Sequence, residues 1–170
     1  MKRSSVLVLL LITAPLSACA AEHGEAVIMG TQPGSKISGM ATLTPVAEGL
    51  KVSVQVANVP PGMHGLHFHE QGACGDTGNA AGGHYNPDKV KHGFLPKDGF
   101  TGAHAGDLGN IEVGPDGTGT LELTIQGLTL SGGPHNVDGR AIILHEKPDD
   151  FGQPTGNAGA RIGCGVITTK

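Results

Sequence analysis

Residues 50–58 read Leu-Lys-Val-Ser-Val-Gln-Val-Ala-Asn, so Val52, Val54 and Val56 alternate with other, mostly polar, side chains. Successive side chains of a β-strand point to opposite faces, and this period of two therefore predicts a strand with one buried face. Similar signals, bounded by turn residues, recur at 26–29, 36–43, 121–125, 141–144 and 162–168. Several short strands without helical periodicity predict an all-β fold, a Greek-key β-sandwich or flattened barrel.

The composition fits short strands joined by tight turns. The 170 residues contain 29 glycines and only 3% aromatic residues, so we expect one domain with a core of Val, Ile, Leu and Ala. The formal charge is −4, and no cluster of Lys and Arg follows the first few residues. Because nucleic-acid binding needs basic side chains that neutralise phosphates, these features argue against a nucleic-acid partner.

Two stretches, residues 71–103 and 146–160, do not follow the strand pattern. Both are rich in Gly, Asp, Asn and Pro. Loops of this length inside a compact domain are usually functional, so we expect the site to be built on them.

The N-terminal segment has the features of an export signal. Lys2 and Arg3 precede an apolar run at residues 6–12, and Leu-Ser-Ala-Cys follows at 16–19. This run resembles a bacterial lipobox, in which the signal is cut before the cysteine and the cysteine is acylated. Ordinary cleavage after Ala20 or Ala21 is the alternative.

On the first interpretation, residues 1–18 are a lipoprotein signal peptide, 19–25 a lipidated tether and 26–170 the folded domain. The expected location is the periplasm or cell envelope. The expected contact with a membrane is through a lipid on Cys19 alone.

The cysteines agree with export. Of three, Cys19 lies in the signal motif, which leaves Cys74 and Cys164 as a pair in an oxidising compartment. We expect one disulfide; two free buried thiols are the alternative.

The histidines indicate metal binding. His67 and His69 are separated by one residue in a strand-like segment, so both imidazoles face the same side while Leu66 and Phe68 face the other. Taken alone, this pair could equally lie on a polar, solvent-facing strand. His84, His92, His104 and Asp107 follow in the first long loop, and three imidazoles with one carboxylate suit tetrahedral zinc.

His145 ends the apolar run at 141–144 and offers a third ligand to His67 and His69. An all-imidazole site suits copper(II). The count of donors therefore predicts two adjacent metals.

These residues lie in longer motifs, which are His-Gly-Leu-His-Phe-His-Glu at 64–70, Gly-His-Tyr-Asn-Pro at 83–87, His-Gly at 92–93, His-Ala-Gly-Asp-Leu-Gly-Asn at 104–110, His-Glu-Lys at 145–147 and Gly-Asn-Ala-Gly-Ala-Arg-Ile-Gly-Cys-Gly-Val at 156–166. The motifs and their spacing resemble those of the copper/zinc superoxide dismutases, and the match runs from about residue 26 to the end.

The resemblance implies that superoxide is disproportionated to oxygen and hydrogen peroxide by a redox-cycling copper. Four histidines would bind copper, and one of them would bridge to a structural zinc. The implied copper ligands are His67, His69, His84 and His145, and the implied zinc ligands are His84, His92, His104 and Asp107. A non-catalytic copper- or zinc-binding or chaperone-like protein of the same fold is the alternative, although such proteins usually lose ligands or the arginine.

The resemblance also implies roles outside the two ligand sets. Asp149 would accept hydrogen bonds from one ligand of each metal, and Arg161 would attract and hold superoxide beside the copper. A surface turn acid and a surface ion pair are the respective alternatives. His64 matches a core histidine bonded to backbone, and we expect His23 and His135 to be solvent-exposed.

Two departures from the eukaryotic enzymes stand out. Cys74 follows His69 by five positions, a short spacing that looks like the bacterial branch and argues against the eukaryotic type of dimer interface, so that a homodimer would use another surface. The loop between His145 and Arg161 lacks most of the charged steering residues of eukaryotic members. Lys97 or Lys147 could replace them.

Overall fold

The computed structural model describes residues 22–170, and the predicted signal peptide and Cys19 lie outside the described residues. The described chain forms nine strands and two short helical segments. They are β1 (Gly24–Gly30), β2 (Ser38–Val46), β3 (Gly49–Ala57), β4 (Gly62–His69), η1 (Asp76–Ala81), α1 (Leu95–Asp98), β5 (Asp107–Val113), β6 (Gly119–Ile125), β7 (Ala141–His145), β8 (Arg161–Val166) and β9 (Thr168–Thr169).

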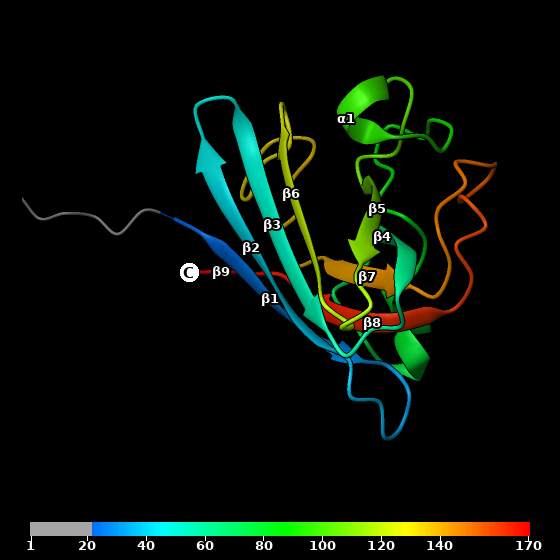
Figure 1. Ribbon diagram of the computed structural model, residues 1–170. Helices are drawn as coiled ribbons and strands as arrows, with labels where there is room; N and C mark the ends of the chain where they lie inside the picture. The colour runs from blue at the N-terminus through cyan, green and yellow to red at the C-terminus, as the bar shows by residue number, and fades with distance from the viewer. Residues whose placement is uncertain (1–21) are drawn as a thin grey trace, which may run out of the picture.

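Eight of the strands close into an antiparallel barrel. The order is β2-β3-β6-β5-β4-β7-β8-β1, and β1 pairs back to β2, while β9 pairs only with β1. Because β3 lies beside β6 rather than β4, the chain crosses between sides of the barrel, as Greek-key connections do. Figure 1 shows β1, β2, β3 and β6 on one side and β4, β5, β7 and β8 on the other. The predicted all-β fold, a Greek-key flattened barrel, is confirmed.

The alternation that predicted β3 fills the core. Leu50, Val52, Val54 and Val56 are all at most 4% exposed, and the residues between them are exposed or half-buried. Burying one such aliphatic side chain contributes about 1.5–3 kcal/mol. The packed core inside the barrel therefore gives rigid support to the side chains on the outer face of its strands.

Strand β7 and residues 64–69 of β4 differ, because they are buried on both faces. Leu66 and Phe68 of β4 point into the core, and Leu66 pairs with Leu144 of β7. The opposite face of the same strands carries buried histidines, which bond to residues of the two long loops, while Ala141 and Ile143 of β7 pack with Ala81 of η1. This doubly covered face of the barrel holds the site.

The structure differs from the sequence expectation in several elements and their bounds. Strand β5 was not predicted, β1 begins two residues before the predicted strand, and the first long loop contains η1 and α1. The early start of β1 follows from pairing of Gly24 with Thr169 of β9. Within residues 22–170, no helix is long and apolar enough to cross a membrane.

Candidate metal centre

Three histidines stand on the outer face of two neighbouring strands. His67 and His69 are on β4, and His145 ends β7, which pairs with β4. His84 reaches the same place from the first long loop, where it forms an isolated bridge with His69. All four side chains are buried, and one ligand atom from each lies within 4.8 Å of the others. The structure thus brings together the four residues predicted to bind copper.

The ring nitrogens of this cluster have a shared arrangement. His69 Nδ1 donates to the Gly82 carbonyl at 3.0 Å, and His67 Nε2 donates to Asp149 Oδ2 at 2.8 Å. Because a carbonyl or an ionised carboxylate can only accept, the proton must sit on those nitrogens. The opposite nitrogens, His67 Nδ1, His69 Nε2 and His145 Nε2, are buried and have no hydrogen-bond partner among residues 22–170.

Buried polar atoms without a partner are uncommon, since leaving one unsatisfied costs about 1–3 kcal/mol. Three lone pairs that converge in one buried place are what a metal ion requires. The residues present therefore fit a copper ion.

The second cluster is formed by the first long loop and the residues that follow it up to β5. It centres on Asp107, the first residue of β5. Its Oδ1 is 2.9 Å from His84 Nδ1 and 3.1 Å from His104 Nδ1, and its Oδ2 is 2.9 Å from His92 Nδ1. His92 Nδ1 nevertheless has no hydrogen-bond partner in the described chain, so it lies beside the carboxylate without donating to it. Three Nδ1 atoms and one carboxylate that face a common point fit tetrahedral zinc.

Backbone bonds fix the carboxylate of Asp107. Its Oδ2 accepts from the amides of Gly93 at 3.0 Å and His104 at 2.9 Å, and the side chain is fully buried. His84 belongs to both clusters, which are therefore adjacent. Since its Nδ1 faces Asp107, its Nε2 is the atom left for the first cluster.

Asp149 connects the two clusters from behind. Its Oδ2 accepts from His67 Nε2 at 2.8 Å and its Oδ1 accepts from His92 Nε2 at 2.9 Å, so it touches one ligand of each predicted set. Asn110 holds the backbone of Asp149 in two directions, at 2.7 and 2.9 Å. The position matches the one that the sequence resemblance implied, and it is not that of a surface turn acid.

Burial sets the protonation of the first cluster. Desolvation lowers the pKa of His69 to about 2, of His145 to about 3 and of His84 to about 4. These imidazoles are neutral near pH 7, as metal ligation requires.

Carboxylates dominate the second cluster. Burial disfavours the charged form of His92, but Asp107 and Asp149 outweigh that effect and raise the pKa of His92 to about 9. Burial would also raise the pKa of Asp107, yet hydrogen bonds from His104, His84 and the Gly93 amide, together with the adjacent His92 ring, hold it well below its usual range. Asp107 therefore stays ionised and can serve as a zinc ligand.

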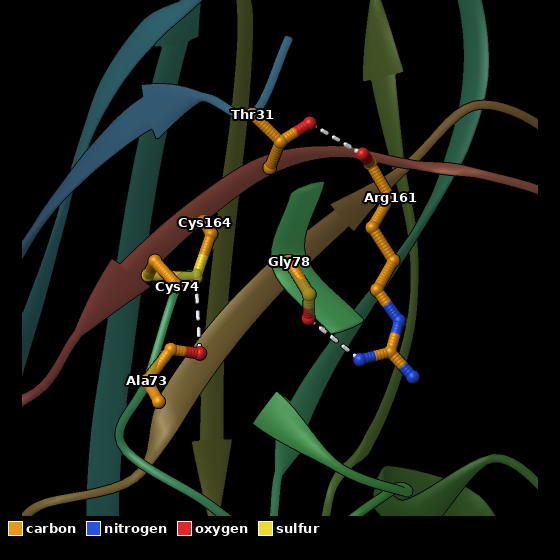
Figure 2. Close-up of a disulfide and its surroundings, with 6 residues drawn as sticks. All are labelled: Thr31, Ala73, Cys74, Gly78, Arg161 and Cys164. Carbon is orange, nitrogen blue, oxygen red and sulfur yellow. Dashed lines mark hydrogen bonds between the residues drawn. A yellow bond between two sulfur atoms is a disulfide. The ribbon is translucent and has the colours of Figure 1, made fainter. Parts of the chain in front are cut away.

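Arg161 begins β8 and lines the same cavity as three histidines of the first cluster. Its Nη1 donates to the Gly78 carbonyl at 2.7 Å, and its own carbonyl accepts from Thr31 Oγ1 (Figure 2). Its Nη2 donates to the Gly82 carbonyl, also at 2.7 Å. The Gly82 carbonyl also accepts a hydrogen bond from His69 Nδ1, so a single carbonyl orients both Arg161 and one predicted copper ligand.

An open cavity of about 490 Å³ lies over the first cluster. It is lined by Arg161 and Lys147 together with His69, His84 and His145. Two cations thus border an opening that leads to three of the buried imidazoles.

A disulfide joins the loop before η1 to β8. Cys74 and Cys164 have their sulfur atoms 1.98 Å apart and their Cα atoms 5.7 Å apart, which confirms the predicted bridge and excludes two free thiols. Figure 2 shows the bridge beside the Gly78 carbonyl that holds Arg161. Sequence reasoning did not find Gly78 or Gly82, because a backbone acceptor leaves no side-chain signal.

The remaining histidines lie outside both clusters. His64 directs its two ring nitrogens at the carbonyls of His145 and Pro60, each at 2.8 Å, as expected of a core histidine. His23 is half-exposed and lies 3.5 Å from Glu25.

The expectation that His135 is solvent-exposed is wrong. Its side chain is only 13% exposed, because it stacks on Phe100 at 3.6 Å between ring centroids and pairs with Asp88 at 2.7 Å. Phe100 and Asp88 both belong to the first long loop.

The barrel and the two donor sets define a β-barrel metalloprotein with two adjacent metal sites that share a histidine. Residues 37–167 match the family described as Copper/zinc superoxide dismutase (SODC). The chain is 41% identical over 147 residues to a protein named Extracellular superoxide dismutase [Cu-Zn] from Haemonchus contortus, which covers 82% of this chain and 78% of that protein. It is 44% identical over 139 residues to Superoxide dismutase [Cu-Zn] 2 from Brassica juncea, with 76% and 81% covered.

The chain is also similar to a solved structure. The crystal structure of a protein called clock protein EA4 matches with a TM-score of 0.76 at 37% identity, over 86% of this chain and 93% of the other. The chain belongs to the copper/zinc superoxide dismutase family. This confirms the predicted enzyme class, an oxidoreductase that disproportionates superoxide, and its two metals, copper and zinc.

Proposed function

We propose that this chain converts two superoxide anions and two protons into oxygen and hydrogen peroxide at the cluster of His67, His69, His84 and His145, which holds copper. The second cluster, with His84, His92, His104 and Asp107, holds zinc. Copper supplies one-electron redox chemistry by alternating between two oxidation states, whereas zinc has none and is structural. The observation that carries this assignment is the set of buried ring nitrogens without hydrogen-bond partners, which face one another in the first cluster.

Arg161 binds the substrate in this proposal. Its guanidinium is held by two backbone carbonyls and lines the cavity over the cluster, so it offers a fixed positive charge to an entering anion. Because the chain as a whole has a formal charge of −4, attraction of superoxide must come from local cations such as this one.

His84 handles a proton. Asp107 orients its Nδ1 side, which leaves Nε2 facing the cavity and the first cluster. At that atom, His84 takes up a proton after the first superoxide is oxidised and returns it towards the peroxide formed from the second. Asp149 keeps the rings of His67 and His92 in one tautomer and orientation throughout.

The test compares superoxide consumption by chain loaded with both metals and by chain loaded with zinc alone. We expect fast turnover only in the first preparation. The rival function, non-catalytic metal storage or delivery, predicts tight binding of copper without turnover in either. The intact copper set and Arg161 favour the enzyme.

We further propose that the protein is exported and anchored as a bacterial-type lipoprotein. Residues 1–18 would be the signal peptide, Cys19 would be acylated, and the tether would end before Gly24, where β1 begins, rather than at residue 25 as the sequence predicted. The enzyme domain would lie in the periplasm or cell envelope. The Cys74–Cys164 disulfide supports an oxidising compartment, and one relative is named as extracellular. Cys19→Ser should move the protein from the membrane to the soluble fraction with unchanged specific activity. Retention in the membrane fraction would contradict the anchor.

A homodimer, if formed, would not use the eukaryotic type of interface, because the segment between His69 and Cys74 is short. Crosslinking with residue-level mapping tests this: crosslinks between copies that involve residues 70–74 would contradict it.

A further inference from the structure

His92, one of the predicted zinc ligands, has three contacts with the loop between β7 and β8. Asp149 accepts from its Nε2 at 2.9 Å, and the ring of Phe151 stacks over the imidazole with 6.5 Å between centroids and 19° between planes. The third contact comes from Gln153 and reaches the main chain rather than the ring. It has no counterpart in the sequence motifs described above.

The amide of Gln153 pairs with both backbone groups of His92. The Gln153 Oε1 atom accepts from His92 N–H at 3.1 Å, and its Nε2 donates to the His92 carbonyl at 2.8 Å. The side chain thus acts as a neighbouring strand would, although the two residues are 61 positions apart. With both backbone bonds made, the peptide of His92 can neither shift nor rotate without losing them.

The surroundings explain why this contact matters. Residues 89–94 form irregular backbone outside the barrel ladder. A cavity of about 350 Å³ lies against His92 here, bordered by Lys91, Asp98, Phe151 and Gln153. On its inner side, Asp107 is fully buried. Solvent therefore approaches this ligand from the side that Gln153 covers.

We propose that Gln153 is a positioning residue for His92, and that its two-point contact slows the release of zinc from the second cluster. The inference rests on the proposed function only in that this cluster holds zinc. Gln153 touches neither metal nor substrate, so its effect should pass through the position of the His92 peptide. Changes to supporting contacts of this kind typically weaken metal binding about 10–100-fold. Because Gln153 is exposed, we expect the lower end of that range.

Three variants of the fully metal-loaded protein test the proposal. Gln153→Met keeps the length of the side chain and removes both hydrogen bonds. Gln153→Glu keeps the acceptor for His92 N–H, but it replaces the donor with an oxygen that faces the His92 carbonyl. Gln32→Ala is the matched control, since Gln32 is an exposed glutamine in the β1–β2 loop, far along the chain from every ligand.

The first measurement is the rate at which zinc passes to an excess of chelator. We expect Gln153→Met to release zinc about tenfold faster, Gln153→Glu to fall between it and the unaltered protein, and Gln32→Ala to match the unaltered protein. Copper content and the copper spin-resonance spectrum should not change in any variant. An unaltered release rate in Gln153→Met, with unaltered far-ultraviolet circular dichroism, would overturn the proposal.

Cobalt(II) bound in place of zinc gives an absorption spectrum that a general loss of protein stability would not change. Its visible absorption reports ligand geometry, so Gln153→Met should shift or broaden the bands while Gln32→Ala should not. Identical cobalt spectra in all proteins would count against a positioning role. If the unaltered protein binds no zinc or cobalt at all, the proposed function itself fails, which is a different result from equal release rates.

Discussion

The two halves of the metal centre are built in different ways. Three of the four residues on the copper side, His67, His69 and His145, stand on paired strands of the barrel. On the zinc side, His84, His92 and His104 all come from one long loop, and only Asp107 belongs to a strand. Strand positions are fixed by a ladder of hydrogen bonds and a packed core beneath them, whereas loop positions must be fixed by individual contacts.

The contacts that hold the loop side are few and specific. Asp149 bonds to the ring of His92 and Gln153 to its backbone, while His135 pairs with Asp88 and stacks on Phe100 elsewhere in the same loop. The barrel therefore preforms the copper side, while the zinc side depends on contacts between loops that are distant in sequence. Predictions that separate the two halves test this difference.

The largest expected effect is on the strand side. His145→Ala removes a predicted copper ligand but no zinc ligand, so superoxide turnover should be abolished while zinc content and the fold persist. Metal analysis and an activity assay on the same preparation measure this. Loss of both metals from a folded variant, or full activity, would contradict the division into two halves.

The next effect is on the loop side. Gly156 has φ +75, and a Cβ there would lie 1.9 Å from Asp149 Oδ1 and 2.7 Å from His92 Nε2. Gly156→Ala should therefore separate Asp149 from His92 and weaken zinc binding by roughly 100-fold, at the upper end for such supporting contacts. Zinc affinity measured by competition with a chelator gives the result.

A control separates this clash from the cost of the backbone conformation. Gly34 has a similar φ of +78 and nothing within 4 Å of its would-be Cβ. Gly34→Ala should lower the free energy of unfolding by about 1 kcal/mol and leave zinc affinity unchanged. Equal zinc affinities in the two variants would contradict the role assigned to Gly156.

The barrel could be predicted where burial has a period of two. Strand β3 buries Leu50, Val52, Val54 and Val56, and its sequence alternates accordingly. Strand β5 was missed because Asp107, Leu108 and Gly109 are all buried, so no alternation is visible at its start. Where a strand is buried on both faces, its sequence does not show the alternation of apolar and polar residues.

The candidate site divides in the same way. Metal-ligating side chains are chemically distinctive, so their types and spacing predicted two donor sets, and the structure brings the members of each set together. The place of His84 in both sets came from the family resemblance. Gln153 and Gly156 matter because the loop between β7 and β8 lies close to His92 of the other long loop. That proximity cannot be predicted from an amide or a glycine in a loop that is rich in such residues. His135 was misread for the same reason, since its partners Asp88 and Phe100 are distant in sequence.

A smaller effect is expected from the substrate-binding cation. Arg161→Gln should lower the second-order rate with superoxide by roughly ten-fold, because the charge fixed at the cavity is lost, and metal content should not change. The remaining rate should depend less on salt. Arg161→Lys should fall between, since a lysine keeps the charge but not the planar pair of donors. A Gln variant with an unaltered rate and salt response would make Arg161 structural.

The smallest effect distinguishes two lysines that sequence alone could not rank. Lys147 lines the same cavity as Arg161, whereas Lys97 lies in α1 beside a different cavity, next to β6. Attraction between an exposed cation and an entering anion falls off over a Debye length of about 10 Å at 0.1 M salt, so position decides which lysine contributes. Lys147→Gln should lower the rate about twofold at low ionic strength, and the difference should shrink as salt is added, while Lys97→Gln should leave the rate unchanged. Stopped-flow rates at several salt concentrations measure both variants under identical conditions. If the two lysines contribute equally, the field that guides superoxide is spread over the whole surface, and the cavity beside the copper side does not focus it.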